Sequence, residues 1–218
     1  LMITVDCGIT AIGEVEFAKL QGMDVIITDH HTCKDRLPTA AEAILNPKRH
    51  DCDYPFDALA GVGVAFKLIL ALAIKNGLKT TDVFNQYVDI ATLGTIADVV
   101  PLLGENRVIV DKGLKILHNP KRIGIRAIME VAGVLDKPLN ASTIAFSIAP
   151  RLNAAGRLGS AATAVELLLT NDESRARELA LLLDTENKER QQTERQIFDE
   201  ALELIAKDPN FEKKKVIV

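Results

Sequence analysis

The chain has 218 residues, of which 48% are hydrophobic and 26% are charged, and its formal net charge is −4. This composition supports a sizeable globular core and excludes a disordered tail. The acidic balance gives no sign of a polyanion-binding surface that covers the whole protein, so any such site has to be local.

The cysteines and the hydropathy pattern bear on the compartment. The three cysteines form no Cys-x-x-Cys pair, which argues against a disulfide scaffold or a zinc cluster and favours a reducing environment. The sequence shows no signal-peptide pattern and no apolar run of about 18 residues. We therefore expect a cytoplasmic protein that does not associate with a membrane.

A short apolar segment near the start of the chain ends in polar residues. Residues 25–27 are β-branched and lack polar alternation, as is typical of a strand covered on both faces of a parallel sheet, and after Thr28 they are followed by Asp29, His30 and His31. Because the ligands of such sheets collect outside the carboxyl ends of the strands, we expect these side chains to form a site there. Taken alone, the same residues are equally typical of a polar turn.

A second segment of this kind, residues 2–5, ends in Asp6. The stretch between the two strands has apolar residues at helical spacing, with Thr10 as the expected cap and Gly22 as the expected end. A strand–helix–strand unit of this length is a right-handed crossover, which brings Asp6 and His30 to the same sheet edge. Carboxylate and imidazole groups together suit Mn²⁺ or a similar divalent ion, and they suit the hydrolysis of phosphate esters.

Weaker signals follow along the chain. Residues 43–45 are predicted to form one more strand, and the polar turn after it holds His50 and Asp51, for which a surface turn explains as much as a metal site does. A helix begins near Gly61, where glycines either admit a phosphate to the backbone amides or allow close packing. The next helix leads to Asp98, a carboxylate among apolar neighbours that needs a metal, an arginine or a helix amino end if it is buried.

The second half of the chain is predicted to be helical apart from one loop. Residues 104–148 are predicted to form three short helices, and residues 149–160 a loop that contains Arg151, Asn153 and Arg157. Arginine forks and open backbone amides bind phosphate, so this loop is a candidate phosphate-binding segment. The alternative is that its two arginines are surface salt-bridge partners.

The last long element is predicted to be a single helix. After a helix at residues 161–169, the stretch from Asp172 to about Lys207 contains no proline or glycine, and it predicts a helix roughly 50 Å long. Its apolar positions are dense at both ends and sparse through residues 187–196. We expect it to connect two domains.

Five stretches resemble, in order and spacing, the DHH phosphoesterases and specifically the RecJ-type single-strand-specific exonucleases. These stretches are Val5-Asp6-Cys7-Gly8, Thr28-Asp29-His30-His31, Leu59–Leu68, Ala97-Asp98 and Arg151–Leu158. The resemblance covers essentially the whole chain. It implies an α/β fold in which a parallel β-sheet is flanked by helices, followed by helical segments and a long connector helix.

The resemblance implies a two-metal phosphodiesterase with Mn²⁺ or Mg²⁺ as cofactor, which removes nucleotides from single-stranded DNA in the 5′-to-3′ direction during recombination and repair. Asp6 matches the carboxylate that bridges the two ions, and His30 and Asp98 match ligands of one ion. Asp29 supports that site. His31 matches the second histidine of the motif, which approaches the scissile phosphate.

The resemblance also implies the partners. Arg151, Asn153 and Arg157 match the loop that faces the nucleic-acid backbone, so single-stranded DNA is the expected substrate. A single-strand-binding protein or a helicase is the expected kind of further partner, and the protein is expected to be a monomer.

Two departures from the family pattern lead us to expect a fragment. The family's first motif, with one histidine and two aspartates, should lie upstream of Leu1. We expect a DHH phosphoesterase domain at residues 1–170, a connector helix at 171–208 and the start of a second, DHHA1-type domain at 209–218. Such a fragment is expected to be inactive alone, because one of its two metal sites keeps only Asp6.

Two other functions stay open. Related DHH enzymes cleave short oligonucleotides, cyclic dinucleotides or pyrophosphate, and the net charge of −4 suits a small substrate. Other relatives are non-catalytic scaffolds of replication complexes, but the presence of Asp6, His30 and Asp98 argues against this interpretation. The loop with Arg151 and Arg157 favours the exonuclease.

Overall fold

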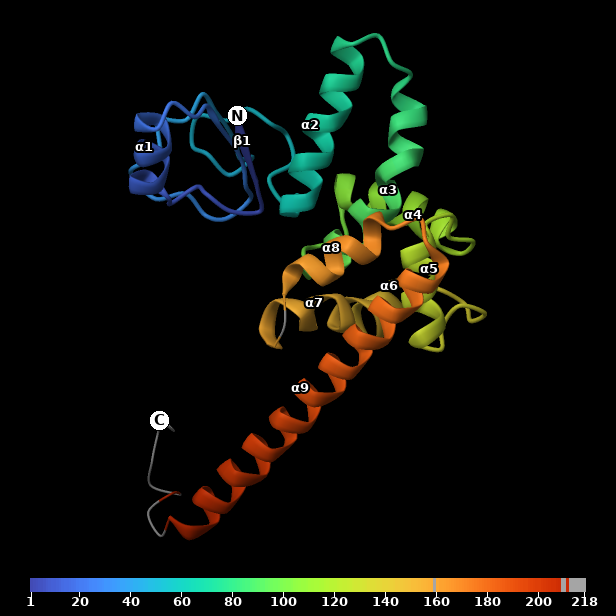
Figure 1. Ribbon diagram of the computed structural model, residues 1–218. Helices are drawn as coiled ribbons and strands as arrows, with labels where there is room; N and C mark the ends of the chain where they lie inside the picture. The colour runs from blue at the N-terminus through green and yellow to red at the C-terminus, as the bar shows by residue number, and fades with distance from the viewer. Residues whose placement is uncertain (159, 209–210, 212–218) are drawn as a thin grey trace. The chain divides into compact units, whose positions relative to one another are not determined.

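The computed structural model describes residues 1–158, 160–208 and 211, with the side chains of residues 157 and 158 left out. It divides into two compact units (Figure 1). The first, which we call the sheet unit, comprises Leu1–Lys121 and Val134–Ala149. The second, which we call the helical unit, comprises Arg122–Gly133 and Pro150–Val218.

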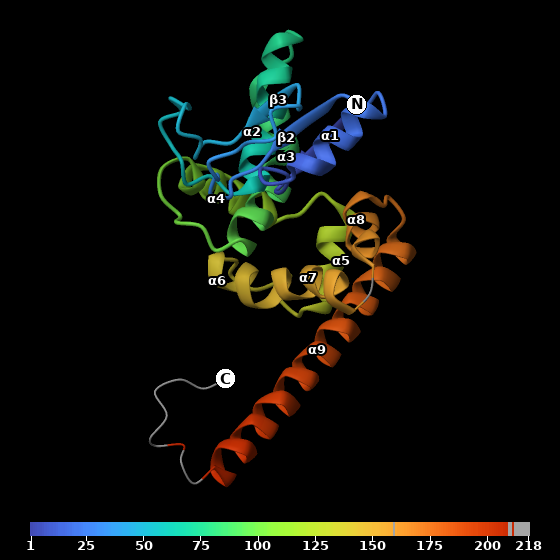
Figure 2. The same ribbon diagram turned by 90° about the vertical axis from the view of Figure 1, so that its left-hand side faces the viewer.

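A three-stranded parallel sheet lies at the centre of the sheet unit. Its strands, in spatial order, are β1 (Met2–Val5), β2 (Val25–Thr28) and β3 (Ala43–Leu45). The central strand β2 is covered on both faces, as its lack of polar alternation predicts, and Val25 and Ile27 are fully buried. The predicted parallel sheet flanked by helices is confirmed (Figure 2).

Helices cover both faces of this sheet and build the rest of the sheet unit. They are α1 (Ile12–Leu20), α2 (Gly61–Lys75), α3 (Thr80–Ala97), α4 (Gly104–Leu117), α6 (Ala141–Thr143) and the π-helical turn η1 (Ile144–Ile148). Helices α1 and α2 lie on opposite sides of the sheet (Figure 1). Val64 and Phe66 of α2 pack with Val88 of α3 and Ile109 of α4 in one apolar cluster, which fixes the start of α2 against the sheet.

One predicted cap in this unit is wrong. Helix α1 begins after Ala11 rather than Thr10, and no side chain caps it. The Ala11 N–H donates to the carbonyl of Gly8 and the Ile12 N–H donates to the carbonyl of Thr10. A backbone turn therefore satisfies the N–H groups for which the threonine hydroxyl was expected.

The helical unit contains α5 (Ile123–Val131), α7 (Ala149–Leu158), α8 (Ala161–Leu169) and α9 (Glu173–Lys207). The loop predicted at residues 149–160 is wrong, because most of this stretch forms α7. Ala154 and Ala155 are fully buried on the inner face of α7. Pro150 is the second residue of α7, so its missing N–H falls where the hydrogen-bond pattern changes from π-helical to α-helical.

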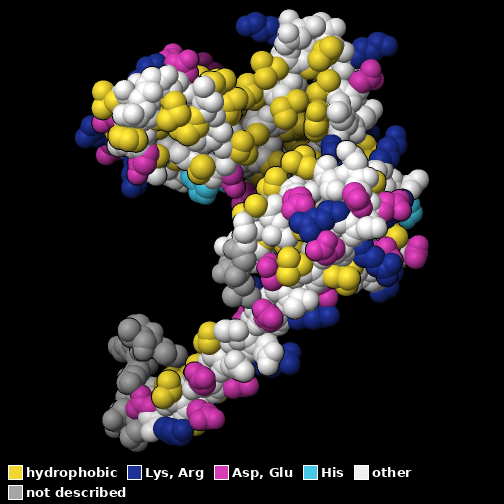
Figure 3. Space-filling model, viewed as in Figure 1, with side chains coloured by type: hydrophobic (Ala, Val, Ile, Leu, Met, Phe, Trp, Pro, Cys, Tyr) yellow, Lys and Arg dark blue, Asp and Glu magenta, His cyan; other side chains and the backbone are white. Residues whose placement is uncertain are grey.

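The long final helix is confirmed as a single element. The first half of α9 packs on α5 and α8 through Ala176, Leu179, Ala180 and Leu183. The second half presents a mixture of charged and apolar side chains to solvent (Figure 3), and Phe198 is 61% exposed. Within the described chain, no helix is both long enough and apolar enough to pass through a membrane.

Candidate metal centre

Asp6 lies directly after β1 in an unusual backbone conformation. Its φ is 62°, in the left-handed region that a short polar residue such as aspartate tolerates better than most. The Asp6 N–H donates to the Thr28 carbonyl at 2.9 Å, which extends the pairing of β1 with β2 by one residue. The side chain is 48% exposed at the carboxyl edge of the sheet, and burial of the remainder raises the pKa of the carboxyl.

Asp29, directly after β2, is buried and organises the backbone around it. One carboxylate oxygen accepts the Ile9 N–H at 2.9 Å, and the other accepts the N–H groups of His30 and His31 at 2.7 and 3.1 Å. Burial alone would raise the pKa of Asp29, but these hydrogen bonds outweigh it and lower the pKa. Asp29 is thus ionised and fully engaged, and it supports the two turns that carry the other polar residues.

His30 is buried between two carboxylates from different parts of the sheet unit. Its Nε2 lies 3.1 Å from Asp6 Oδ1 and 3.4 Å from Asp98 Oδ2. Neither ring nitrogen makes a hydrogen bond to the described residues, which is unusual for a buried imidazole. The predicted convergence of Asp6, His30 and Asp98 is confirmed, and an orphaned buried nitrogen between two acids is what a cation-binding site requires.

Asp98 reaches the site from the end of α3 rather than from a strand. It is the C-cap residue of α3, and its N–H donates to the carbonyl of Gly94. Its side chain is 33% exposed, so Asp98 is not a buried carboxylate, and a partner is not required on grounds of burial. The next residue, Val99, has φ 59°, a strained conformation for a β-branched residue.

His31 is the most exposed member of the cluster, with a side chain that is 60% exposed. Its Nδ1 lies 2.7 Å from Asp29 Oδ1, and since Asp29 is ionised, Nδ1 carries the proton of this hydrogen bond. The hydrogen bond to Asp29 raises the pKa of His31. Ligand atoms of Asp6, His30 and His31 lie within 4.8 Å of one another, and no other trio of potential metal ligands is recorded in the described part of the chain.

Asn46 completes the edge and was missed by the sequence analysis. It follows β3 and is buried, and its amide donates to the His31 carbonyl at 2.9 Å while its oxygen accepts the Lys48 N–H at 2.8 Å. The only signal in the sequence was an Asn-Pro pair at the end of a predicted strand, which is typical of a turn. In the structure Asn46 ties the histidine turn to β3.

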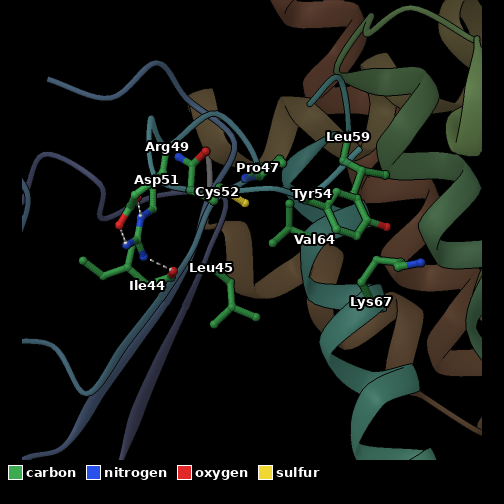
Figure 4. A pocket seen from close by; sticks show the side chains of 11 residues that line it. Ile44, Leu45, Pro47, Arg49, Asp51, Cys52, Tyr54, Leu59, Val64 and Lys67 are labelled. Carbon is green, nitrogen blue, oxygen red and sulfur yellow. Dashed lines mark hydrogen bonds and ion pairs between the residues drawn. The ribbon is translucent and has the colours of Figure 1, made fainter. Parts of the chain in front are cut away.

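A cavity of about 320 Å³ lies beyond β3 at the same edge (Figure 4). Its walls are mainly apolar, with Leu45, Leu59 and Val64 among them. The charged groups that line it are already paired: Asp51 accepts two hydrogen bonds from Arg49, and Lys67 donates to Glu105. The pairing of Asp51 with Arg49 also favours the surface turn over the metal site for this segment.

The predicted phosphate-binding residues belong to α7 in the helical unit. Arg151 Nε donates to Asp184 Oδ1 at 2.9 Å, and both side chains are largely buried. Asn153 is exposed. The side chain of Arg157 lies outside the described residues. The roles of these three residues stay predictions.

Known proteins resemble this chain in sequence and in fold. Residues 1–95 match the model of the DHH family, N-terminal domain. Among curated proteins, it is 45% identical to the single-stranded-DNA-specific exonuclease RecJ of Bacillus subtilis over 205 residues, which cover 94% of this chain and 25% of that protein. The resemblance to RecJ-type proteins is therefore confirmed.

Solved structures give the same result. A crystal structure of exonuclease RecJ bound to manganese superposes with a TM-score of 0.83 at 38% identity, covering 93% of this chain and 50% of that one. The structure of RecJ from Thermus thermophilus in complex with Mg²⁺ gives a TM-score of 0.73 at 36% identity, covering 96% of this chain and 29% of that one. The chain spans between a quarter and a half of the length of these relatives.

Proposed function

We propose that this protein is a metal-dependent phosphodiesterase that degrades single-stranded DNA from its 5′ end, as a RecJ-type exonuclease of recombination and repair. The observation that carries the proposal is the buried imidazole of His30, with both nitrogens lacking hydrogen bonds to the described residues and with Asp6 and Asp98 within 3.4 Å. The relatives named for this activity support the choice of substrate.

Asp6, His30 and Asp98 would hold one divalent cation, Mn²⁺ or Mg²⁺, and Asp6 would also serve as a ligand of a second cation. Bound there, such cations supply charge stabilisation at the phosphate oxygens and activation of a water molecule. Asp29 keeps the turn that carries His30 in place through its bonds to the backbone. No nucleophilic side chain is required.

His31 has a separate role in this proposal. Asp29 holds its Nδ1–H and raises its pKa, so the proton-bearing form is favoured. The other nitrogen, Nε2, then donates a hydrogen bond to an oxygen of the scissile phosphate. Asn46 fixes the backbone carbonyl of the same residue, which limits the directions that the imidazole takes.

Arg151, Asn153 and Arg157 would contact the nucleic-acid backbone. The bond from Arg151 Nε to Asp184 orients the guanidinium, which suits a planar group that recognises phosphate by geometry. The substrate range and the cellular setting belong to the same proposal: a cytoplasmic monomer that meets single-stranded DNA together with a single-strand-binding protein or a helicase.

The proposed domain organisation follows the relatives. It has a DHH phosphoesterase domain at residues 1–170, a connector helix at 171–208 and the beginning of a DHHA1-type domain at 209–218. Residues 209–210 and 212–218 lie outside the described residues. The exposed second half of α9 supports the connector, because Ile197 and Phe198 are apolar and 61% exposed.

The test pairs metal binding with cleavage. Mn²⁺ is titrated calorimetrically into the wild type, His30→Ala and His118→Ala, the last being a histidine at the end of α4 that serves as the matched control. Nucleotide release is then measured in the complete protein on a 5′-phosphorylated single strand, on a duplex and on a dinucleotide. We expect His30→Ala to lose both Mn²⁺ binding and nucleotide release, and His118→Ala to keep both.

Equal Mn²⁺ binding by wild type and His30→Ala would overturn the proposed metal centre. A preference for the dinucleotide as substrate would favour an oligonucleotide phosphodiesterase instead.

A further inference from the structure

The carboxylate of Asp6 has little hydrogen-bond support for a proposed metal ligand. Asp29 accepts bonds from three backbone N–H groups and one imidazole. For Asp6, the only recorded polar partner among the described residues is His30 Nε2 at 3.1 Å. Something other than hydrogen bonding has to hold this carboxylate in place.

The first residue of α2, Gly61, lies directly against Asp6. A Cβ atom built at Gly61 would lie 2.1 Å from Asp6 Oδ1, 2.5 Å from its Cγ and 2.6 Å from its Cβ. Such distances are far inside van der Waals contact, and close-packed interiors do not tolerate them. All three of the nearest atoms belong to Asp6, so the fit at this position is specific to that side chain.

Neither partner of this contact can easily move. Asp6 is held by its N–H bond to the Thr28 carbonyl, and because its own Cβ is involved in the clash, a rotation about χ1 alone would not relieve it. On the other side, Leu59 and Ala60 are buried just before α2, and Val64 packs in the core one turn later. The backbone at the start of α2 is therefore held in place by its packing and cannot easily move away from Asp6.

We infer that Gly61 is a positioning residue for the metal centre: the missing side chain lets the Asp6 carboxylate rest against α2 and face His30. The ligand role of Asp6 is part of the proposed function, and the inference rests on it to that extent. The steric part of the inference, that Gly61 and Asp6 are coupled, stands on the contact alone.

The experiment compares three glycines in the full chain. Gly61→Ala is the test variant. Gly13→Ala, in α1, adds a methyl group with nothing within 4 Å, and Gly63→Ala, in the first turn of α2, places it 3.2 Å from the flexible end of Leu59. Mn²⁺ affinity is measured by calorimetry, and the coordination of bound Mn²⁺ by electron paramagnetic resonance.

We expect Gly61→Ala to weaken Mn²⁺ binding about 10- to 100-fold, the range typical for the loss of a group that orients a metal ligand, and to change the resonance spectrum. Gly13→Ala and Gly63→Ala should stay within about twofold of the wild type, as substitutions away from a ligand usually do. A folded Gly61→Ala variant with wild-type affinity and spectrum would overturn the inference. A wild type that binds no Mn²⁺ would instead overturn the proposed function.

A second measurement, in EDTA, needs no metal. The midpoint of urea unfolding is compared for the wild type, Gly61→Ala, Asp6→Gly and the double variant. If the two residues are in steric conflict, Gly61→Ala lowers the midpoint strongly in the wild type and only slightly when Asp6 is glycine. The same comparison covers a Gly61→Ala chain that does not fold, because Asp6→Gly should then restore folding. Equal losses in both backgrounds, or no restoration, would overturn the coupling.

Discussion

Each of the two units contains a buried aspartate, Asp29 in the sheet unit and Asp184 in the helical unit, and the two carboxylates are neutralised in different ways. In the sheet unit, Asp29 is held by backbone N–H groups and an imidazole, with no lysine or arginine recorded against it in the described chain. In the helical unit, Asp184 is held by two cations, Arg151 at 2.9 Å and Lys188 at 2.7 Å. The first cluster is organised mainly by backbone dipoles and one imidazole, and the second by a lysine and an arginine.

The two regions differ in whether a lysine or an arginine is paired with their carboxylates. Lys188 and Arg151 balance Asp184, so that cluster needs nothing further. At the sheet edge, Asp6 and Asp98 approach one imidazole, and the described lysines and arginines form no ion pair with either. Carboxylates that share a site with no lysine or arginine paired to them favour a bound cation. The incomplete cluster is the one that belongs to the proposed function.

The largest expected effect is the loss of Asp29. Asp29→Ala leaves the buried N–H groups of Ile9 and His30 without an acceptor, and we expect the free energy of unfolding in EDTA to fall by roughly 3–5 kcal/mol. Asp98→Ala, at an exposed helix end, should change it by less than about 0.5 kcal/mol. Urea unfolding at pH 7 measures both. Equal losses would mean that Asp29 supports the site no more than a ligand such as Asp98 does.

The helical unit should lose less from the matching change. Asp184→Ala leaves the Arg151 guanidinium largely buried without this partner, and we expect a loss of about 2–3 kcal/mol, below the range for a fully buried pair. Lys188→Ala is the control, and because its side chain is 71% exposed it should cost less than about 0.5 kcal/mol. A loss from Asp184→Ala as small as that from Lys188→Ala would remove the contrast between the two clusters.

These two clusters also show what a sequence can and cannot predict. The strand ends at Asp6 and Asp29 were predictable because a short apolar run followed by polar residues is a local pattern, and parallel pairing then brings the ends together. The pairing of Arg151 with Asp184 has no local pattern, since the two residues are far apart in the chain. Residues around Arg151 looked like a loop because of Pro150 and two glycines, whereas the buried alanines of α7 decide the structure.

Other features of the site depend on geometry alone. Asn46 and Gly61 both resemble ordinary turn or packing residues in the sequence, and only the folded chain shows that one holds His31 and the other contacts Asp6. The apolar neighbours of Asp98 left open whether its carboxylate is buried, and the structure shows it partly exposed at the end of α3. Sequence patterns therefore identified the chemical groups, and the residues that position them became visible only in the structure.

A smaller effect is expected at the strained residue beside Asp98. Val99 occupies the position after the C-cap of α3 with φ 59°, where Gly77 stands with φ 67° in the equivalent position of α2. Val99→Gly should raise the free energy of unfolding by about 0.5–1 kcal/mol, because relief of the strain exceeds the entropy that glycine adds to the unfolded chain. Gly77→Val is the matched reverse change and should lower it. If Val99→Gly destabilises instead, the exposed valine makes contacts that outweigh its strain.

The smallest expected effect tests whether a cluster is electrostatically balanced because its charges are paired, and not because of the unit in which it lies. The sheet unit has a paired network of its own: Lys67 Nζ donates to Glu105 at 2.9 Å, and the Tyr54 hydroxyl donates to the same carboxylate. Burial alone would raise the pKa of Glu105, but Lys67 and Tyr54 outweigh it and lower the pKa. The stability from this carboxylate is thus present above its unfolded pKa of about 4.3 and is lost as the pH falls through the lower folded pKa.

Because the side chains of Lys67 and Glu105 are partly exposed, Glu105→Gln should lower the free energy of unfolding by only about 0.5–1 kcal/mol at pH 7. Urea unfolding between pH 3 and pH 8 should show the difference in the free energy of unfolding between wild type and Glu105→Gln closing below about pH 4. A difference in the free energy of unfolding that persists at pH 3 would mean that the network acts by packing Tyr54 and not by pairing charge. Charge pairing would then not explain the contrast between the Asp29 and Asp184 clusters.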